Sequence, residues 1–500
     1  MRNYDYYFND GITFTAIGNS FSSRLNGKGY LFDTKGPTMF GEHLVYVCGF
    51  VNSIVFDYYN RMLCKQLTKS GDSVNLVPFC YDYHAKNIEK TIEATVSLSK
   101  YDWDSFETSW DFMVHPLVRC KSFSPEEVAE DAKHNIVDMN YVKEAVKRWS
   151  NECYLRFQKL KENEEELNRI FIDIYGLQDE LTPEVEDKDI TVHRVFENRD
   201  EVPDSMKNSN YTRTYRDEIV SLLSYAVGCM FGRYSIYKDG LLFAGEPYSL
   251  QTFADKLNDR PGTISAEELQ RAYRNEGVVV DEMFFPDADN VIPITDEEYL
   301  DDDIVSRLCD WLKVVYGTDT LEANLDYIAK ALGNKGSTSR EVIRNYFVND
   351  FFKDHCQTYS VTGSGKRPIY WLFDSGKQNG FKALVYLHRY TPDTIGNLRV
   401  DYLHKMQRVY ESEIGRMQDM IDHSTNAREV AVATKRKEKL QKQLKECRDY
   451  DEMIAHLALS RIELDLDDGV KVNYRKIQTA ADGKFYEVLA DSKSIMAKEK

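Results

Sequence analysis

Residues 363–402 hold the residue types that could act on a nucleic acid, because Lys and Arg alternate there with Tyr, Trp, Phe and His. A cation neutralises a backbone phosphate and a flat ring stacks on a base, so this pairing suits a nucleic-acid surface. The cations that would contact phosphate are Lys366, Arg367, Lys377, Arg389 and Arg399. The alternative is a small sheet whose core consists of Tyr370, Trp371, Phe373 and Tyr386, with its cations solvated.

Catalytic motifs are missing around this block. The stretch Gly363–Lys366 resembles a phosphate loop, but Ser360 and Arg367 stand where a Walker sequence needs Gly and Ser or Thr. Amino-group methylation with S-adenosylmethionine needs a glycine-rich turn and an Asn/Asp-Pro-Pro-aromatic loop that receives a flipped base. No Pro-Pro pair occurs in the sequence, so we expect no methylation by this chain alone.

Metal sites are not indicated either. Asp33 and Lys35 at a strand end and the carboxylate run 301–303 lack further acids at a suitable spacing, and we interpret both as solvated surface. The loop around Asp287 lacks the glycine and the closing Glu of an EF-hand. No HExxH or Cys pair suggests zinc, and no GxSxG elbow supports a Ser/His/Asp triad.

Charge is unevenly distributed along the 500 residues, whose net charge is −18. Residues 281–310 carry eleven acids and one Arg, whereas residues 360–445 carry sixteen Lys or Arg and nine acids. A local basic face can bind DNA whatever the net charge. We expect the acidic face at 281–303 to point away from DNA. The run Lys435–Lys445 is interpreted as a solvated helix face, with DNA contact as the less favoured alternative.

The elements that would position these residues can be read from hydrophobic period and turn signals. Residues 12–40 alternate between glycine-containing turns and predict antiparallel strands. A long helix is expected from 124 to about 175, ended by Gly176, and another at 212–233. Strands near 368–373 and 382–387 precede two charged helices, 398–422 and 427–458, which predict a projecting coiled hairpin. A strand-like tail follows and should pack back. The fold class is therefore α+β and helix-rich, with small antiparallel sheets.

Cysteine usage and hydropathy favour a cytoplasmic protein. The nine cysteines are scattered without a CxxC pair, which is typical of reduced thiols. The apolar stretch 44–56 is short and interrupted by Asn52 and Ser53, so a buried helix is expected there rather than a membrane span.

Several segments resemble the PglX family of adenine-specific DNA methyltransferases from BREX phage-defence systems. They are 14–41, 167–185, 218–245, 367–403 and the later 466–478. The resemblance covers nearly the whole chain but only the C-terminal, target-recognition part of such an enzyme. The catalytic domain, which binds S-adenosylmethionine, would then lie before Met1 or on another subunit, and no cofactor is expected in this chain.

The resemblance implies four segments: a β-rich recognition segment (1–120), a long helix and connector (121–185), a helical domain with an acidic surface (186–338), and a C-terminal α/β domain with the hairpin (339–500). It also implies double-stranded DNA, a catalytic methyltransferase partner and other defence proteins as partners. The candidates for DNA contact are, at a first site, Ser22, Arg24, Lys28 and Lys35, and, at a second, Lys366, Arg367, Lys377 and Arg389. A scaffold subunit without DNA contact and an enzyme of unrecognised type remain open.

Overall fold

The computed structural model describes residues 3–18, 21–63, 68–69, 71–82, 85–119, 140–257, 283–361 and 365–497. It divides into two compact units: an N-terminal unit of Met1–Phe106 with Trp149–Thr214, and a C-terminal unit of Glu107–Arg148 with Tyr215–Lys500. Each unit is described by itself. The predicted helix start at Ser124, a predicted helix at 265–276 and the turn at Gly363 lie outside the described residues. The four predicted segments stay a prediction.

The N-terminal unit begins with the expected antiparallel sheet. Its strands are β1 (Gly11–Phe14), β2 (Ser23–Asn26) and β3 (Thr38–Met39), in the order β2-β1-β3. The remaining elements of the unit are α1 (Leu44–Val51), α2 (Ile54–Leu63), α3 (Gly71–Val74), α4 (Ala85–Asp104), the greater part of α7 (Val142–Tyr175), β4 (Arg194–Phe196) and β5 (Thr212–Thr214). The sequence of residues 74–97 is also consistent with a short strand followed by a helix; in the described residues the segment after α3 is coil, and α4 follows it.

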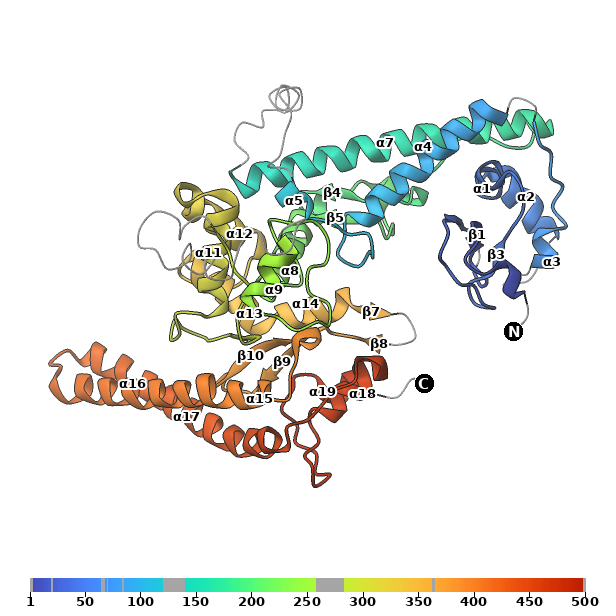
Figure 1. Cartoon of the computed structure of the whole chain (residues 1–500). Helices are drawn as coiled ribbons and strands as arrows, with labels where there is room; N and C mark the ends of the chain where they lie inside the picture. Colours follow the sequence, from blue (N-terminus) through green and yellow to red (C-terminus); the bar gives the residue numbers. More distant parts are fainter. Residues whose placement is uncertain are drawn as a thin grey trace. The chain divides into compact units, whose positions relative to one another are not determined.

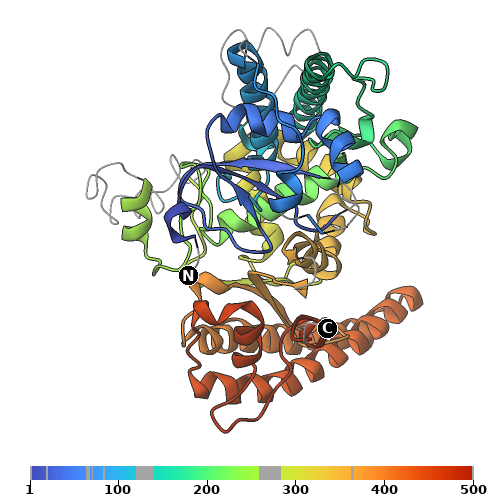
Figure 2. The same cartoon turned by 90° about the vertical axis from the view of Figure 1, so that its right-hand side faces the viewer.

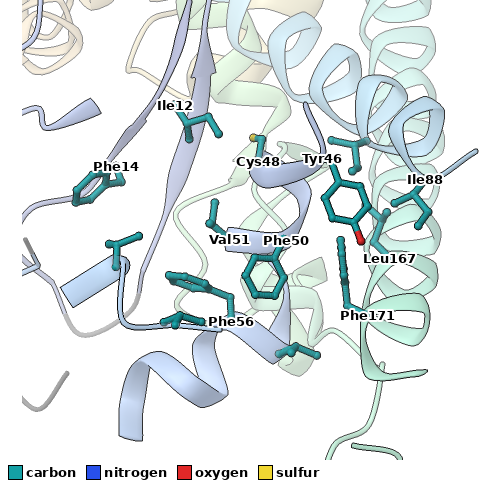
Figure 3. Packing of buried hydrophobic residues seen from close by; sticks show 14 of the residues in the cluster. Ile12, Phe14, Tyr46, Cys48, Phe50, Val51, Phe56, Ile88, Leu167 and Phe171 are labelled. Atoms are coloured by element: carbon teal, nitrogen blue, oxygen red, sulfur yellow. The ribbon is translucent and has the colours of Figure 1, made fainter. Parts of the chain in front are cut away.

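The apolar stretch 44–56 is buried, as expected, and forms two helices rather than one. Asn52 ends α1, and its side chain accepts from Ser23 N (3.1 Å) and donates to Ser23 Oγ (2.9 Å), which ties the helix to β2. Figure 3 shows Tyr46 and Phe50 of α1 directed at Phe171 of α7, with ring centroids 5.6 Å apart in both pairs. None of the helices in the described residues combines the length and apolarity that a membrane crossing requires.

Helix α7 ends where the sequence predicts. Gly176 adopts a left-handed backbone (φ 65°), and the N–H of Leu177 then donates to the carbonyl of Ile172 (3.0 Å). This is the geometry of a helix C-terminus that requires glycine because other residues pay a steric cost there.

The C-terminal unit is built around a second antiparallel sheet, β6-β10-β9. Its strands are β6 (Val291–Pro293), β9 (Tyr370–Asp374) and β10 (Lys382–Tyr386), and β7 (Ser360–Val361) pairs separately with β8 (Gly365–Lys366). The helices around the sheets are α5 (Pro116–Arg119), α8 (Tyr215–Met230), α9 (Leu250–Leu257), α11 (Ile304–Tyr316), α12 (Leu321–Leu332), α13 (Ser339–Asn349), α14 (Phe351–Thr358) and α15 (Thr394–Asn397). Figure 2 shows the sheet strands between these helices and the C-terminal ones.

The predicted helical hairpin is confirmed. A π-helical turn, Leu398–Leu403, leads into α16 (His404–His423), and α17 (Ala427–Ser460) returns beside it (Figure 1). The predicted strand-like tail is wrong in conformation, because Gly469–Lys476 is a helix, α18, followed by α19 (Ser492–Ile495). The tail does pack back: Tyr474 meets the Trp371 ring edge-on at 5.2 Å.

Candidate nucleic-acid interface

The first group of candidate residues lies directly before β2, on it and in the loop that joins it to β3. Arg24 is exposed on β2, Lys28 in the turn after it and Lys35 further along the loop, whereas Ser22 is half-buried. The loop is held by Asp33, whose carboxylate accepts the N–H groups of Lys35 (2.7 Å) and Gly36 (2.8 Å). These hydrogen bonds lower the pKa of Asp33. The interpretation of Asp33 and Lys35 as solvated surface agrees with their exposure.

Arg24 also interacts with other residues of the N-terminal unit. Its guanidinium donates to the Ser23 carbonyl (2.8 Å). Burial raises the pKa of Glu164 on α7 to about 7, and the charge of Arg24 opposes that rise. Lys28 and Lys35 have no ion pair among the described residues, so their charge remains available to an external anion.

Exposed apolar side chains beside these lysines were missed by the sequence reasoning. Tyr30 is 59% exposed and Leu31 is 64% exposed. Phe8, also exposed, lies against the same turn, because its N–H donates to the Tyr30 carbonyl and its carbonyl accepts from Gly29 (both 3.1 Å). The signal was present as aromatic residues directly after the turn glycines, but it was interpreted only as strand alternation.

The aromatic residues of the second candidate block are core. Tyr370, Trp371, Phe373 and Tyr386 are all buried in the β9–β10 pair, which confirms the alternative that assigned them to a small sheet. No ring of this set is available to stack on a base. Only the cations around the sheet could therefore contact DNA.

Arg389 is not one of those available cations. It is 7% exposed, donates to the Phe231 (2.9 Å) and Ala288 (3.2 Å) carbonyls, and lies over the Tyr248 ring. The expectation that it contacts phosphate is therefore at odds with its position. Its guanidinium instead donates to backbone carbonyls of two segments distant in sequence.

The other cations of this block are nearer the surface. Lys366 is half-buried and forms an ion pair with Asp491 (3.0 Å), and Arg367 is exposed beside it. Lys377 is exposed in the turn between β9 and β10. Arg399 is engaged by Asp451 of α17 (2.7 Å).

Part of the acidic stretch is paired or buried within the protein. Asp296 binds Lys439 and Glu297 binds Arg436 (both 2.6 Å), so these carboxylates neutralise cations of α17. Asp303 is fully buried as the N-cap of α11, and the interpretation of the whole run 301–303 as solvated is wrong for it. Asp296, Glu297 and Asp303 therefore add no free negative charge to the surface, whereas Glu298 and Asp301 are exposed. Residues 281–282 lie outside the described part, and the expectation that the acidic stretch points away from DNA stays a prediction.

No metal centre forms among the described residues, since no three His, Cys, Asp or Glu side chains gather there. The seven cysteines in that part are free, and all but Cys80 are buried. The two groups of candidate cations belong to different units.

Comparisons with known proteins find relatives of the family that the sequence resembles. No family model matches the chain. The adenine-specific methyltransferase PglX of Lacticaseibacillus casei (strain Zhang) is 37% identical over 479 residues, which cover 94% of this chain. The adenine-specific methyltransferase BrxX of Escherichia coli O9:H4 (strain HS) is 32% identical over 99% of it. The chain spans about a third of the length of these relatives, 34% and 37%. The PglX-like resemblance is thus confirmed.

Proposed function

From this similarity to PglX and BrxX, we propose that the chain is a DNA target-recognition portion of an adenine-specific DNA methyltransferase of a BREX phage-defence system. The observation that carries the proposal is that both relatives match nearly the whole of this chain but only about a third of their own length. A methyltransferase has to bind its duplex as well as transfer the methyl group. The Asn-Pro-Pro-aromatic loop that performs the transfer is absent from this sequence.

Recognition would use polar and charged side chains in two ways. Lys28 and Lys35 of the first group would neutralise phosphates, which sets the register of the chain on the duplex. Ser22 and Arg24 would reach base edges in the major groove. Lys366, Arg367 and Lys377 are the candidates in the C-terminal unit, and Arg389 is left out because it is buried.

The methyl transfer itself would be performed by a partner of this chain. A catalytic partner domain or subunit would bind S-adenosylmethionine, which supplies the methyl group, and would receive the flipped adenine. This chain would hold the duplex in register while that base is extruded. Such a role implies the cytoplasm, where the DNA and the other defence proteins are.

The test is DNA binding by the purified chain at increasing salt. We expect the affinity for a 30-base-pair duplex to fall as KCl rises, since each neutralised phosphate releases counterions. The double variant K28Q/K35Q should lower the log–log salt slope by about 2, at about 1 per phosphate contact. K159Q is a matched control, because Lys159 is exposed on α7 of the same unit and pairs with Glu162.

A second measurement connects binding to methylation. Adding the catalytic part of a PglX-like enzyme and tritiated S-adenosylmethionine should label adenine in duplex DNA only when this chain is present. Binding of the native chain that does not weaken with salt, together with unchanged methylation in its absence, would refute the proposed function.

One observation favours a second candidate, a scaffold subunit without DNA contact. The free end of the hairpin carries two exposed apolar side chains, Met420 on α16 and Val432 on α17. An apolar hairpin end is typical of a protein contact. In that case the substitution M420S/V432S would abolish assembly with the catalytic part, whereas K28Q/K35Q would change nothing.

A further inference from the structure

The turn between β9 and β10 is fixed on α17 by side chains of that helix. The carboxylate of Glu446 accepts from Ser375 Oγ (2.8 Å), Gln378 N (2.8 Å) and Gly380 N (3.0 Å). From α16, Tyr410 OH donates to the Gly380 carbonyl (2.9 Å). The turn is therefore hydrogen-bonded to both helices of the hairpin.

Two more features show that this contact is close and specific. The Gln443 amide donates to the carbonyls of Gln378 (3.2 Å) and Asn379 (3.3 Å). A Cβ at Gly380 would lie 2.7 Å from the Gln443 carbonyl and 3.0 Å from Cys447 Sγ, so only glycine fits there. The turn is pressed against the helix backbone.

Lys377 lies at the middle of this turn, between the residues that Glu446 binds. On α17, Lys442 and Lys445 each precede one residue of the contact, Gln443 and Glu446. They are three residues apart, so they occupy neighbouring positions on one helix face. All three lysines are exposed, and none has an ion pair among the described residues. We call Lys377, Lys442 and Lys445 the lysine platform.

The charge around the lysine platform is positive. Between Lys435 and Arg448, α17 carries seven Lys or Arg and two Glu. Lys439 and Arg436 form ion pairs with Asp296 and Glu297. The positive charge of the platform lysines is not neutralised in this way. Compact ammonium groups on exposed positions complement the negative charge of the phosphate backbone.

We propose that the lysine platform binds the sugar-phosphate backbone of duplex DNA, and that Glu446 is a positioning residue that holds Lys377 in it. This inference rests on the proposed function and deepens it by naming a backbone contact in the C-terminal unit. The run Lys435–Lys445 then divides into cations that stabilise the fold and cations that face the duplex.

The sharpest test is whether Glu446→Ala strengthens or weakens DNA binding. By electrostatics alone, removing a carboxylate beside DNA strengthens binding. As a positioning residue, Glu446 is needed for the turn, so E446A should weaken binding and lower the salt slope by about 1, the contribution of one phosphate contact. Adding K377Q to E446A should then have no further effect. Glu438→Ala is the matched control, because Glu438 is an exposed carboxylate on α17 that makes no hydrogen bond to the turn.

The lysines are tested directly in the full-length chain with the same 30-base-pair duplex. K377Q/K442Q/K445Q should lower the salt slope by about 3 at about 1 per contact. These side chains are exposed, so the variant should fold normally, which circular dichroism checks even if E446A is destabilised. A native slope in the triple variant, or tighter binding in E446A, would overturn the inference. If K28Q/K35Q still lowers the slope in that case, the proposed function stands. If the native chain shows no salt-dependent binding, both fail.

Discussion

Replacing Arg344 with methionine should destabilise the C-terminal unit far more than the same change at Arg340, one turn earlier on α13. Arg344 forms an ion pair with Asp303, whose side chain is 0% exposed while that of Arg344 is 7% exposed. Arg340 instead forms two hydrogen bonds with Glu322 (2.8 and 2.6 Å) at the surface. The two arginines thus share a helix and a chemistry and differ in burial.

The expected difference follows from what each substitution leaves behind. Without Arg344, the carboxylate of Asp303 stays buried, with hydrogen bonds from Val305 N (3.0 Å), Ser306 N (2.9 Å) and Thr295 Oγ1 (3.0 Å) but no countercharge. Removing one partner of a buried ion pair costs about 3–5 kcal/mol. Removing an exposed partner, as in R340M, costs about 1 kcal/mol or less, because water solvates the remaining carboxylate.

Hydrogen exchange measured by mass spectrometry on peptides from α11 and α13 checks this. Exchange reports the local free energy of opening and does not require the whole chain to unfold in one step. The double variant R344M/D303S should recover much of the loss, because Ser still caps α11 and no charge remains buried. A loss in R344M as small as that in R340M would refute the structural role of Asp303.

Three other predictions concern single residues. Burial, and then the charge of neighbouring Asp287, raises the pKa of Asp289 to about 7, so the folded state keeps a proton that the unfolded state loses near its usual pKa of about 4. The stability contributed by this group is therefore lost as pH rises from about 4 to about 7, and D289N should gain stability relative to the native chain over that window, measured by urea unfolding at each pH. Gly176→Ala should cost about 1 kcal/mol because φ is positive there, and a lower urea midpoint would show it, whereas G415A, in the middle of α16, should not lower it. Tyr30→Ala should weaken duplex binding without changing the salt slope, since an exposed ring contributes apolar contact with base edges rather than phosphate neutralisation, and unchanged affinity would contradict a DNA role for this turn.

Local pattern was sufficient for much of the fold. The alternation and turn glycines of residues 12–40 predicted antiparallel strands, and the structure has them, though their order was not predicted. The interruption at 423–426 placed the connection between α16 and α17 within a few residues. Both features depend on near neighbours in the chain. The conformation of 469–476 was mistaken because its short apolar alternation also fits a helix whose Tyr474 is buried.

One feature of the sequence does indicate that the aromatic block is core, although the charged residues around it draw attention away from it. Residues 370–373 are four consecutive apolar residues, and a strand without alternation is covered on both faces. Lys382, in the partner strand, is itself buried and paired with Asp374 (3.1 Å). Counting its charge as surface charge made the block seem more exposed than it is.

Contacts between distant segments could not be read from one sequence. Asp296 and Lys439 are far apart along the chain, and no local rule connects them. The same holds for Arg389, whose acceptors at Phe231 and Ala288 belong to two other segments. The sequence therefore predicted the exposed turns of the candidate site. It did not show which cations are paired within the protein and which are available to bind DNA.

The pairing of some cations within the protein changes the interpretation of the uneven charge distribution along the chain. A chain of net charge −18 repels a polyanion at long range, so binding has to come from cations that no carboxylate of the protein neutralises. Arg436 and Lys439 are neutralised by the acidic stretch, so much of the contrast between 281–310 and 360–445 is internal pairing. The exposed cations that form no ion pair among the described residues include Lys28, Lys35 and Lys377 in turns and Lys442 and Lys445 on α17. Because those turns are fixed by Asp33 and Glu446, an anionic residue beside a lysine is here compatible with DNA binding: each carboxylate accepts backbone N–H groups and holds the loop that presents the cation.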